Sequence, residues 1–122
     1  MTRPLRVLLD ENLPVKLKYR LIDDTIFVST VRDQNWLGKK NGELLSAMQS
    51  EDFDVLISKD KYLGYQQNAS NFSLIILQLN AFSNSYDDLL PLVSVIKETL
   101  LNIKSELENN QLTSFLEIRN LP

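Results

Sequence analysis

Short apolar runs alternate along this chain with stretches of helical periodicity, and this alternation constrains the fold more than any other feature. The clearest runs are LRVLL at 5–9, DVLIS at 54–58 and SLIILQL at 73–79. The last is nearly all β-branched residues and leucine, which is typical of a strand covered on both faces at the centre of its sheet. Parallel neighbours need crossover connections, so alternating strands and helices predict a mostly parallel sheet. We therefore expect an α/β fold, a single-domain three-layer sandwich whose mostly parallel central sheet of about five strands is flanked by helices.

Two further strands and three helices fill the gaps between these runs: strands at 25–30 and 113–118, and helices at about 12–21, 41–48 and 88–109. Asn12 and Pro14 supply the N-cap and the early-turn proline of the first helix. Asn41 can cap the second helix, and Asp88 can cap the third, which is long and amphipathic. The strand at 113–118 closes the chain and is expected at an edge of the sheet.

The residue types that are missing narrow the chemistry. A length of 122 residues with 43% hydrophobic content suits one globular domain, which we place at 1–122. The chain has neither cysteine nor histidine, so disulfides, zinc sites built on thiolate or imidazole, and serine–histidine catalysis are excluded. Carboxylates, lysines and hydroxyls remain, and carboxylates favour hard ions such as Mg²⁺ or Mn²⁺. The sequence shows no signal peptide and no membrane span, so we expect a cytoplasmic protein without a membrane partner.

The net charge of −3 is unevenly distributed. Residues 1–66 carry ten basic and ten acidic side chains, whereas residues 67–122 carry three basic and six acidic side chains. Non-specific nucleic-acid binding normally shows as a basic surface. The overall charge therefore gives no support for such binding. The one basis for it that the charge distribution leaves is a local basic patch.

Carboxylates follow two of the expected strands. Asp10 and Glu11 come directly after the first strand, and Asp60 follows the third strand after Lys59. The carboxyl ends of parallel strands share one rim, where ligands of such sheets bind. Converging acids repel one another unless a cation or a proton neutralises them, so a divalent-metal site is one explanation. The alternative explanation is that Asp10 and Glu11 interact with the positive end of the dipole of the next helix and that Asp60 is an ordinary turn residue.

These acids belong to a series of short motifs: LLDENLP near the N-terminus, then VRD, a helix, VLISKD and the final FLEIR. In this order the motifs resemble the PIN-like nucleases, most closely their short single-domain branch, which is grouped with the toxins of toxin–antitoxin pairs. The resemblance covers most of the chain. It implies a PIN-like parallel sheet between helices, and a Mg²⁺- or Mn²⁺-dependent ribonuclease that hydrolyses phosphodiester bonds with a cluster of acids.

The resemblance also implies roles for individual residues. Asp10 stands where the family has its first metal-binding aspartate. Asp60 matches the aspartate of the family's threonine-x-aspartate motif, and Ser58 takes the place of the threonine. The implied metal ligands and catalytic acids are Asp10, Glu43 and Asp60. Glu43 is the least direct of them, because it can also be present only for its interaction with the helix dipole.

Two departures from the family pattern bear on this chemistry. Asn41 stands where the middle helix of the family opens with an aspartate, and Tyr62 stands at the family's usual second aspartate after Asp60. A two-metal phosphodiester site needs enough negative ligands to hold both cations. Glu43 is assigned to the site because it can replace the charge that Asn41 lacks.

Substrate binding is assigned to Lys59, Lys61, Asn12 and Ser58. Lys59 and Lys61 bracket Asp60 and can hold phosphate oxygens as point charges, without reading bases. The alternative for each lysine is a solvated charge that serves solubility.

Other residues near these motifs have two interpretations each. Lys16 and Lys18 follow the first motif and are either phosphate ligands or solvated charges. Asp33 is either an outer acid of the site or a solvated loop carboxylate. Trp36 either stacks on unpaired bases or packs its loop onto the sheet, and the second interpretation is favoured.

The leading hypothesis for function is a metal-dependent endoribonuclease of toxin–antitoxin type, with RNA as its substrate and an antitoxin protein as the partner that covers the site. A catalytically degenerate PIN-like module that binds RNA or protein is the alternative. A second copy of the chain, bound through the long helix or the last strand to form a homodimer, is a further candidate partner.

A minor alternative is a receiver-like phosphoacceptor domain. VLLDEN followed by Asp60, 50 residues after Asp10, is similar to the acidic pair and the phosphoacceptor of response-regulator receivers. Receivers need a hydroxyl residue after the fourth strand and a lysine after the fifth, whereas this chain offers Leu79-Asn80 and Arg119-Asn120.

Overall fold

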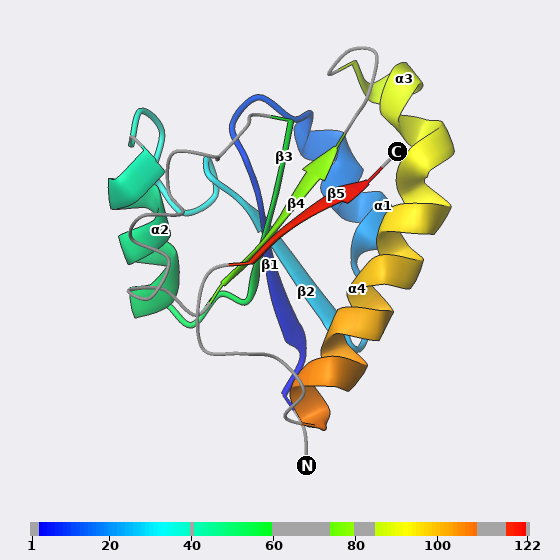
Figure 1. Ribbon diagram of the computed structural model, residues 1–122. Helices are drawn as coiled ribbons and strands as arrows, with labels where there is room; N and C mark the ends of the chain where they lie inside the picture. The colour runs from blue at the N-terminus through cyan, green and yellow to red at the C-terminus, as the bar shows by residue number, and fades with distance from the viewer. Residues whose placement is uncertain (1–2, 40, 60–73, 80–84, 110–116, 122) are drawn as a thin grey trace.

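All strands of the structure belong to one parallel sheet. The computed structural model describes residues 3–39, 41–59, 74–79, 85–109 and 117–121. Its strands are β1 (Leu5–Leu9), β2 (Ile26–Thr30), β3 (Val55–Ser58), β4 (Ile75–Leu79) and β5 (Glu117–Leu121). They lie in the order β2-β1-β3-β4-β5, and every neighbouring pair is parallel (Figure 1). The prediction of an α/β fold with a parallel sheet is confirmed.

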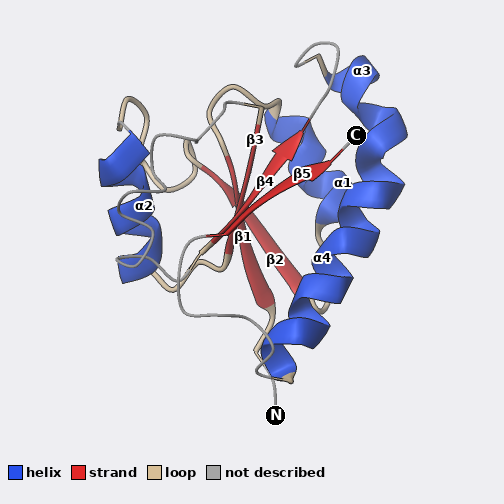
Figure 2. Cartoon of the chain, in the orientation of Figure 1, coloured by secondary structure: helices blue, strands red, loops and turns tan. Residues whose placement is uncertain are grey.

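Helices cover both faces of this sheet. They are the 3-10 helix η1 (Val15–Leu17), α1 (Lys18–Leu21), α2 (Asn41–Ser50), α3 (Tyr86–Leu89), the 3-10 helix η3 (Leu90–Leu92) and α4 (Val93–Glu108). Figure 2 shows α2 alone on one side of the strands, and α1, α3 and α4 together on the other. The arrangement is that of a three-layer sandwich.

Two hydrophobic cores, one on each face, hold the layers together. Because side chains alternate along a strand, Val7 and Leu9 of β1 face α1 and α4, whereas Leu8 faces α2. The first core takes its helical side chains from η1, α1, α3 and α4: Leu17, Leu21, Leu89, Ile96, Leu100 and Ile103. The second core takes them from α2: Leu44, Leu45 and Met48. Burying one such side chain contributes about 1.5–3 kcal/mol, so these apolar stripes fix where the helices lie.

The outer edge of β2 is closed by hydrogen bonds at both of its ends. Ile26 exchanges two backbone hydrogen bonds with Asp23, at 3.2 and 3.3 Å. At the other end, the Thr30 amide donates to Oδ2 of Asp33, and the Thr30 carbonyl accepts from the Gln34 amide. These bonds occupy the two ends of the outer edge, which makes β2 a poorer template for a further strand.

The first helix starts later than the sequence predicts. Asn12 is not its N-cap, because the Leu13 amide donates to the Asp10 carbonyl at 3.0 Å and Asn12 lies inside that turn. The first helical residue is Val15, and Pro14 precedes it in an extended conformation (φ −68°, ψ 136°). The predicted end at Leu21 is correct.

Three further predictions need correction or adjustment. The cap before the long helical region is Ser85 and not Asp88, since Oγ of Ser85 accepts from the Asp88 amide at 3.2 Å. The middle strand is β3, whereas β4 is an inner strand between β3 and β5. Both strands are buried along their whole length, so burial alone does not show which of them is the middle strand. The last strand lies at an edge as predicted, but it begins at Glu117, and residues 113–116 lie outside the described part.

Trp36 packs as the favoured interpretation predicts. It is half-buried against the second core, and its ring meets that of Phe53 edge-on with 5.9 Å between centroids.

Within the described ranges, no helix combines the length and the apolar character needed to cross a bilayer.

Candidate functional site

The strand order places a ligand-binding position between β1 and β3. After β1 the chain forms β2 on one side of it, and then crosses to form β3 on the other side. At such a switch point the connections leave the sheet in opposite directions and open a crevice beyond the carboxyl ends of the two strands. The residues that end β1 and β3 therefore decide what this position can bind.

Asp10 occupies this position on the β1 side. It follows Leu9, the last residue of β1, and only 6% of its surface is exposed. Its backbone amide donates to the Ile57 carbonyl at 3.0 Å, so the ladder to β3 extends through Asp10. The turn to Leu13 then leads the chain away from the sheet. The backbone of Asp10 is thus fixed from both sides.

The carboxylate of Asp10 joins the two strands. Oδ1 accepts from the Glu11 amide at 2.8 Å, and Oδ2 accepts from Oγ of Ser58 at 2.7 Å. Ser58 is the last residue of β3 and is completely buried. The Ser58 hydroxyl therefore holds the Asp10 carboxylate directly.

This arrangement fits part of a site for a hard divalent cation. Hydrogen bonds from the Glu11 amide and from Oγ of Ser58 orient the two carboxylate oxygens, and a carboxylate oxygen can accept more than one bond. Mg²⁺ is commonly bound by one or two carboxylates together with waters and substrate phosphates. Among the described residues, no group of three or more acidic side chains is placed to hold a metal ion. Asp10 is the buried acid that the described residues place at the carboxyl ends of β1 and β3.

The other residues of the two motifs lie around this pair. Glu11 is exposed, Asn12 is half-buried in the turn, and Lys59 is half-buried directly after Ser58. Asp60, Lys61 and Tyr62 fall outside the described residues, so the meeting of Asp60 with Asp10 stays a prediction.

Glu43 lies on a different element from Asp10. It is exposed on α2, whose buried side is formed by Leu44, Leu45 and Met48. Together with Lys39, Ser46, Ala47 and Ser50 it lines a shallow depression on the outer side of that helix. No hydrogen bond or ion pair in the described part of the chain joins Glu43 to Asp10, so its metal role stays a prediction to which its exposure gives no support.

Asp33 has a structural partner. Nζ of Lys18 donates to Oδ2 of Asp33 at 2.8 Å, and Asp33 also forms a reciprocal pair of hydrogen bonds with Thr30, as in a capping box. The hydrogen bond with Lys18 is the main cause that lowers the pKa of Asp33 and raises the pKa of Lys18, against burial. Asp33 thus ties the start of α1 to the end of β2.

The sequence interpretation missed Tyr86, the first residue of α3. Its hydroxyl accepts from Nε of Arg20 at 2.8 Å, and Nζ of Lys16 lies 5.7 Å from its ring centroid. The i, i+4 spacing of Lys16 and Arg20 is visible in the sequence, but nothing in the sequence connects them with a tyrosine 66 residues beyond Arg20.

Comparisons with known proteins assign no family to this chain. No family model, no curated protein and no solved structure matches it. The resemblance to PIN-like nucleases therefore stays a prediction, and the function is argued from the site.

Proposed function

We propose that this protein is a Mg²⁺- or Mn²⁺-dependent endoribonuclease of PIN-like, toxin–antitoxin type. The observation that carries the proposal is the Asp10 carboxylate, which is almost fully buried at the switch point of the sheet and hydrogen-bonded across two strands to Ser58. A carboxylate in this position is where a metal-binding acid of a doubly wound sheet is expected.

The energetics of Asp10 favour a functional role over a purely structural one. Burying a carboxylate removes its hydration, a cost that hydrogen bonds such as those from the Glu11 amide and Oγ of Ser58 must offset. An apolar side chain next to the core residues Leu9 and Ile57 would stabilise the fold at least as well. A polar group kept at a ligand-binding rim despite this cost is a functional-site candidate.

The proposal gives each candidate residue a role. Asp10 binds the metal ion together with Asp60, and Glu43 is the third candidate ligand. The bound cation supplies a nucleophilic water and neutralises phosphate charge. Lys59, next to Ser58 at the rim, and Lys61 hold phosphate oxygens of the RNA, and Asn12 contacts the same strand from the turn after β1.

Digestion of RNA tests this proposal. Purified protein is incubated with a fluorescently labelled single-stranded RNA and Mn²⁺ or Mg²⁺, and the products are separated on a denaturing gel. We expect cleavage that EDTA abolishes and that Asp10→Asn removes. Asp54→Asn is the matched control, because Asp54 is a mostly buried carboxylate that is paired with Arg3 at the opposite end of the sheet. Cleavage that survives Asp10→Asn would contradict the proposal.

The strand order favours a second candidate, a receiver-like phosphoacceptor domain. The order 2-1-3-4-5 is the one that receiver folds share with other doubly wound sheets. Asp60 comes two residues after the end of β3 in the sequence, and Asp10 and Glu11 directly follow β1 as an acidic pair. Against it, β5 ends at Leu121 and contains no lysine.

Treatment with acetyl phosphate separates the two candidates. A stable mass increase of one phosphoryl group that Asp60→Asn abolishes would support the receiver-like function. An unchanged mass, together with Mn²⁺-dependent cleavage of RNA, is the result expected of the nuclease.

A further inference from the structure

Tyr86 gathers two cations on one face of the first helix. Lys16 of η1 and Arg20 of α1 are one helical turn apart and both reach Tyr86, one over its ring and one at its hydroxyl. Like charges at this spacing destabilise a helix by repulsion. The contacts with Tyr86 hold them together all the same, which concentrates positive charge at one point of the surface.

Among the described residues, no acid forms an ion pair with either cation. Lys18, Lys97, Lys104 and Arg3 all form ion pairs, whereas no ion pair involves Lys16 or Arg20 in the described part of the chain. This holds although Asp87 and Asp88 follow Tyr86 in the first turn of α3. The two charges are therefore available to an external anion.

The position of this pair relates it to Asp10. The helix η1 begins five residues after Asp10, and α3 follows the carboxyl end of β4. In Figure 1 the start of α1 and α3 lie toward the end of the sheet at which the β4 arrow points. Asp10 and Ser58 end their strands at that same rim, so an extended polyanion bound by Lys16 and Arg20 can continue to Asp10.

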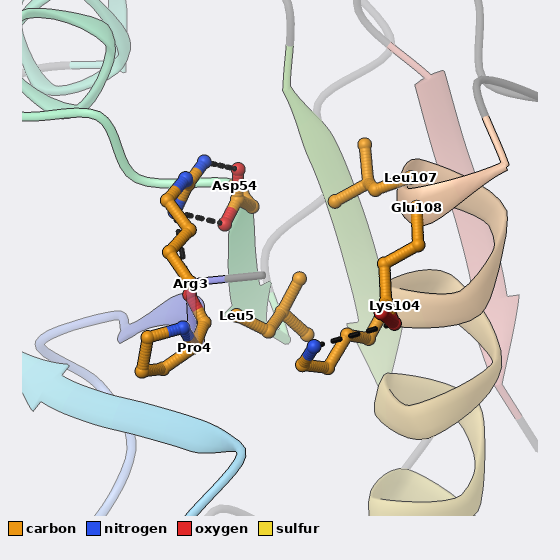
Figure 3. A pocket seen from close by; sticks show the side chains of 7 residues that line it. All are labelled: Arg3, Pro4, Leu5, Asp54, Lys104, Leu107 and Glu108. Atoms are coloured by element: carbon orange, nitrogen blue, oxygen red, sulfur yellow. Dashed lines mark hydrogen bonds and ion pairs between the residues drawn. The ribbon is translucent and has the colours of Figure 1, made fainter. Parts of the chain in front are cut away.

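The opposite end of the sheet provides a contrast. A pocket of about 280 Å³ lies there, and its two cations are each held by an acid within the pocket, Arg3 by Asp54 and Lys104 by Glu108 (Figure 3). Its charges are satisfied internally. Arg3 and Lys104 are thus paired within their pocket, whereas Lys16 and Arg20 form no ion pair in the described part of the chain.

We infer that Lys16 and Arg20, positioned by Tyr86, bind backbone phosphates of a single-stranded RNA and lead it across η1 toward Asp10. This inference rests on the proposed function for its substrate class. Tyr19 lies between the two cations in the sequence and is 69% exposed, so its ring offers a surface on which an unpaired base stacks. A basic pair with an exposed aromatic neighbour is the pattern of single-strand binding.

The test is the salt dependence of binding to a fluorescein-labelled oligouridylate, measured by anisotropy in EDTA so that no cleavage occurs. Each phosphate contact with a single strand contributes about 0.7 to the slope of log K against log salt. Lys16→Gln/Arg20→Gln is expected to reduce the slope by about 1.4. The matched control, Arg3→Gln/Lys104→Gln, removes the same charge at the far end and is expected to leave the slope unchanged. Circular dichroism confirms that both double variants are folded.

Tyr19→Ala gives a second readout that charge loss alone does not produce. It is expected to weaken oligouridylate binding about five-fold or more without changing the salt slope, because stacking releases no counterions. An unchanged slope in Lys16→Gln/Arg20→Gln, an equal loss in the control, or binding of poly-glutamate in place of oligouridylate would overturn the inference. Binding of RNA in EDTA, together with no cleavage in the separate digestion with Mn²⁺ or Mg²⁺, would refute only the proposed nuclease and leave this inference standing.

Discussion

Removing the Ser58 hydroxyl tests whether the carboxylate of Asp10 is held as the structure shows. In Ser58→Ala, Oδ2 of Asp10 loses a donor at 2.7 Å in a site where Ser58 is completely buried and Asp10 is 6% exposed. A hydrogen bond to a charged group contributes about 1.5–3 kcal/mol to stability. The substitution removes one oxygen atom and leaves little empty volume. We therefore expect the free energy of unfolding to fall by about 1.5–3 kcal/mol.

Ser29→Ala is the matched control for this measurement. Ser29 is also buried in a strand, but its Oγ accepts from Nε2 of a neutral amide, Gln34, at 2.9 Å. Such a bond contributes about 0.5–1.5 kcal/mol. Urea unfolding followed by the fluorescence of Trp36, the single tryptophan, gives both values. A loss for Ser58→Ala no larger than that for Ser29→Ala would refute the reasoning.

Two further predictions concern charged side chains away from Asp10. The pKa of Asp33 is lowered mainly by the hydrogen bond from Lys18. The charged form of Asp33 therefore stabilises the fold above its unfolded-state pKa of about 3.9, and this stabilisation is lost as the pH falls below that value. From about pH 5 to about pH 3, the urea midpoint of the wild type should fall more than that of Asp33→Asn, and equal falls would contradict the ion pair. The guanidinium of Arg6 lies 4.8 and 4.7 Å from the ring centroids of Phe27 and Phe53. In urea unfolding, Arg6→Ala should lower the free energy of unfolding by about 1–2 kcal/mol, and Arg6→Lys should lower it less. Equal costs for the two variants would speak against the cation–π contacts.

The strands were predictable because their apolar runs have few alternative structures. LRVLL and DVLIS became β1 and β3 with at most one residue of difference, since a short run covered on both faces fits a parallel sheet and little else. The middle position of β3 was not predictable. The position of β3 in the sheet depends on which side of the existing strands each crossover connection places the next strand. No local pattern in 54–58 or 73–79 encodes that side.

The errors at helix starts have a local cause. Asn12, Asp88 and Ser85 are all good capping residues, so composition alone does not choose among them. At the first helix the hydrogen bond from the Leu13 amide to the Asp10 carbonyl makes a turn that uses Asn12. At the third, Ser85 lies three residues before Asp88, and Oγ of Ser85 accepts from the Asp88 amide as an N-cap does.

The candidate site was predictable where it depends on strand ends and not where it depends on packing. Asp10 and Ser58 meet because β1 and β3 are neighbours, and both positions followed from the motifs. The exposure of Glu43 could have been found from α2 itself, since Leu44, Leu45 and Met48 mark the buried stripe and Glu43 lies off it. The contact of Tyr86 with Arg20 joins distant segments and has no sequence signal.

Binding of a divalent cation by Asp10 is the central claim, and a crystal soaked in Mn²⁺ tests it most directly. We predict anomalous density at coordination distance, about 2.1 Å for a hard cation of this size, from the Asp10 carboxylate at the carboxyl ends of β1 and β3. The same soak of Asp10→Asn crystals should show none. An ordered Asp10 carboxylate still bonded to Ser58, with no anomalous density beside it at saturating Mn²⁺, would contradict the account.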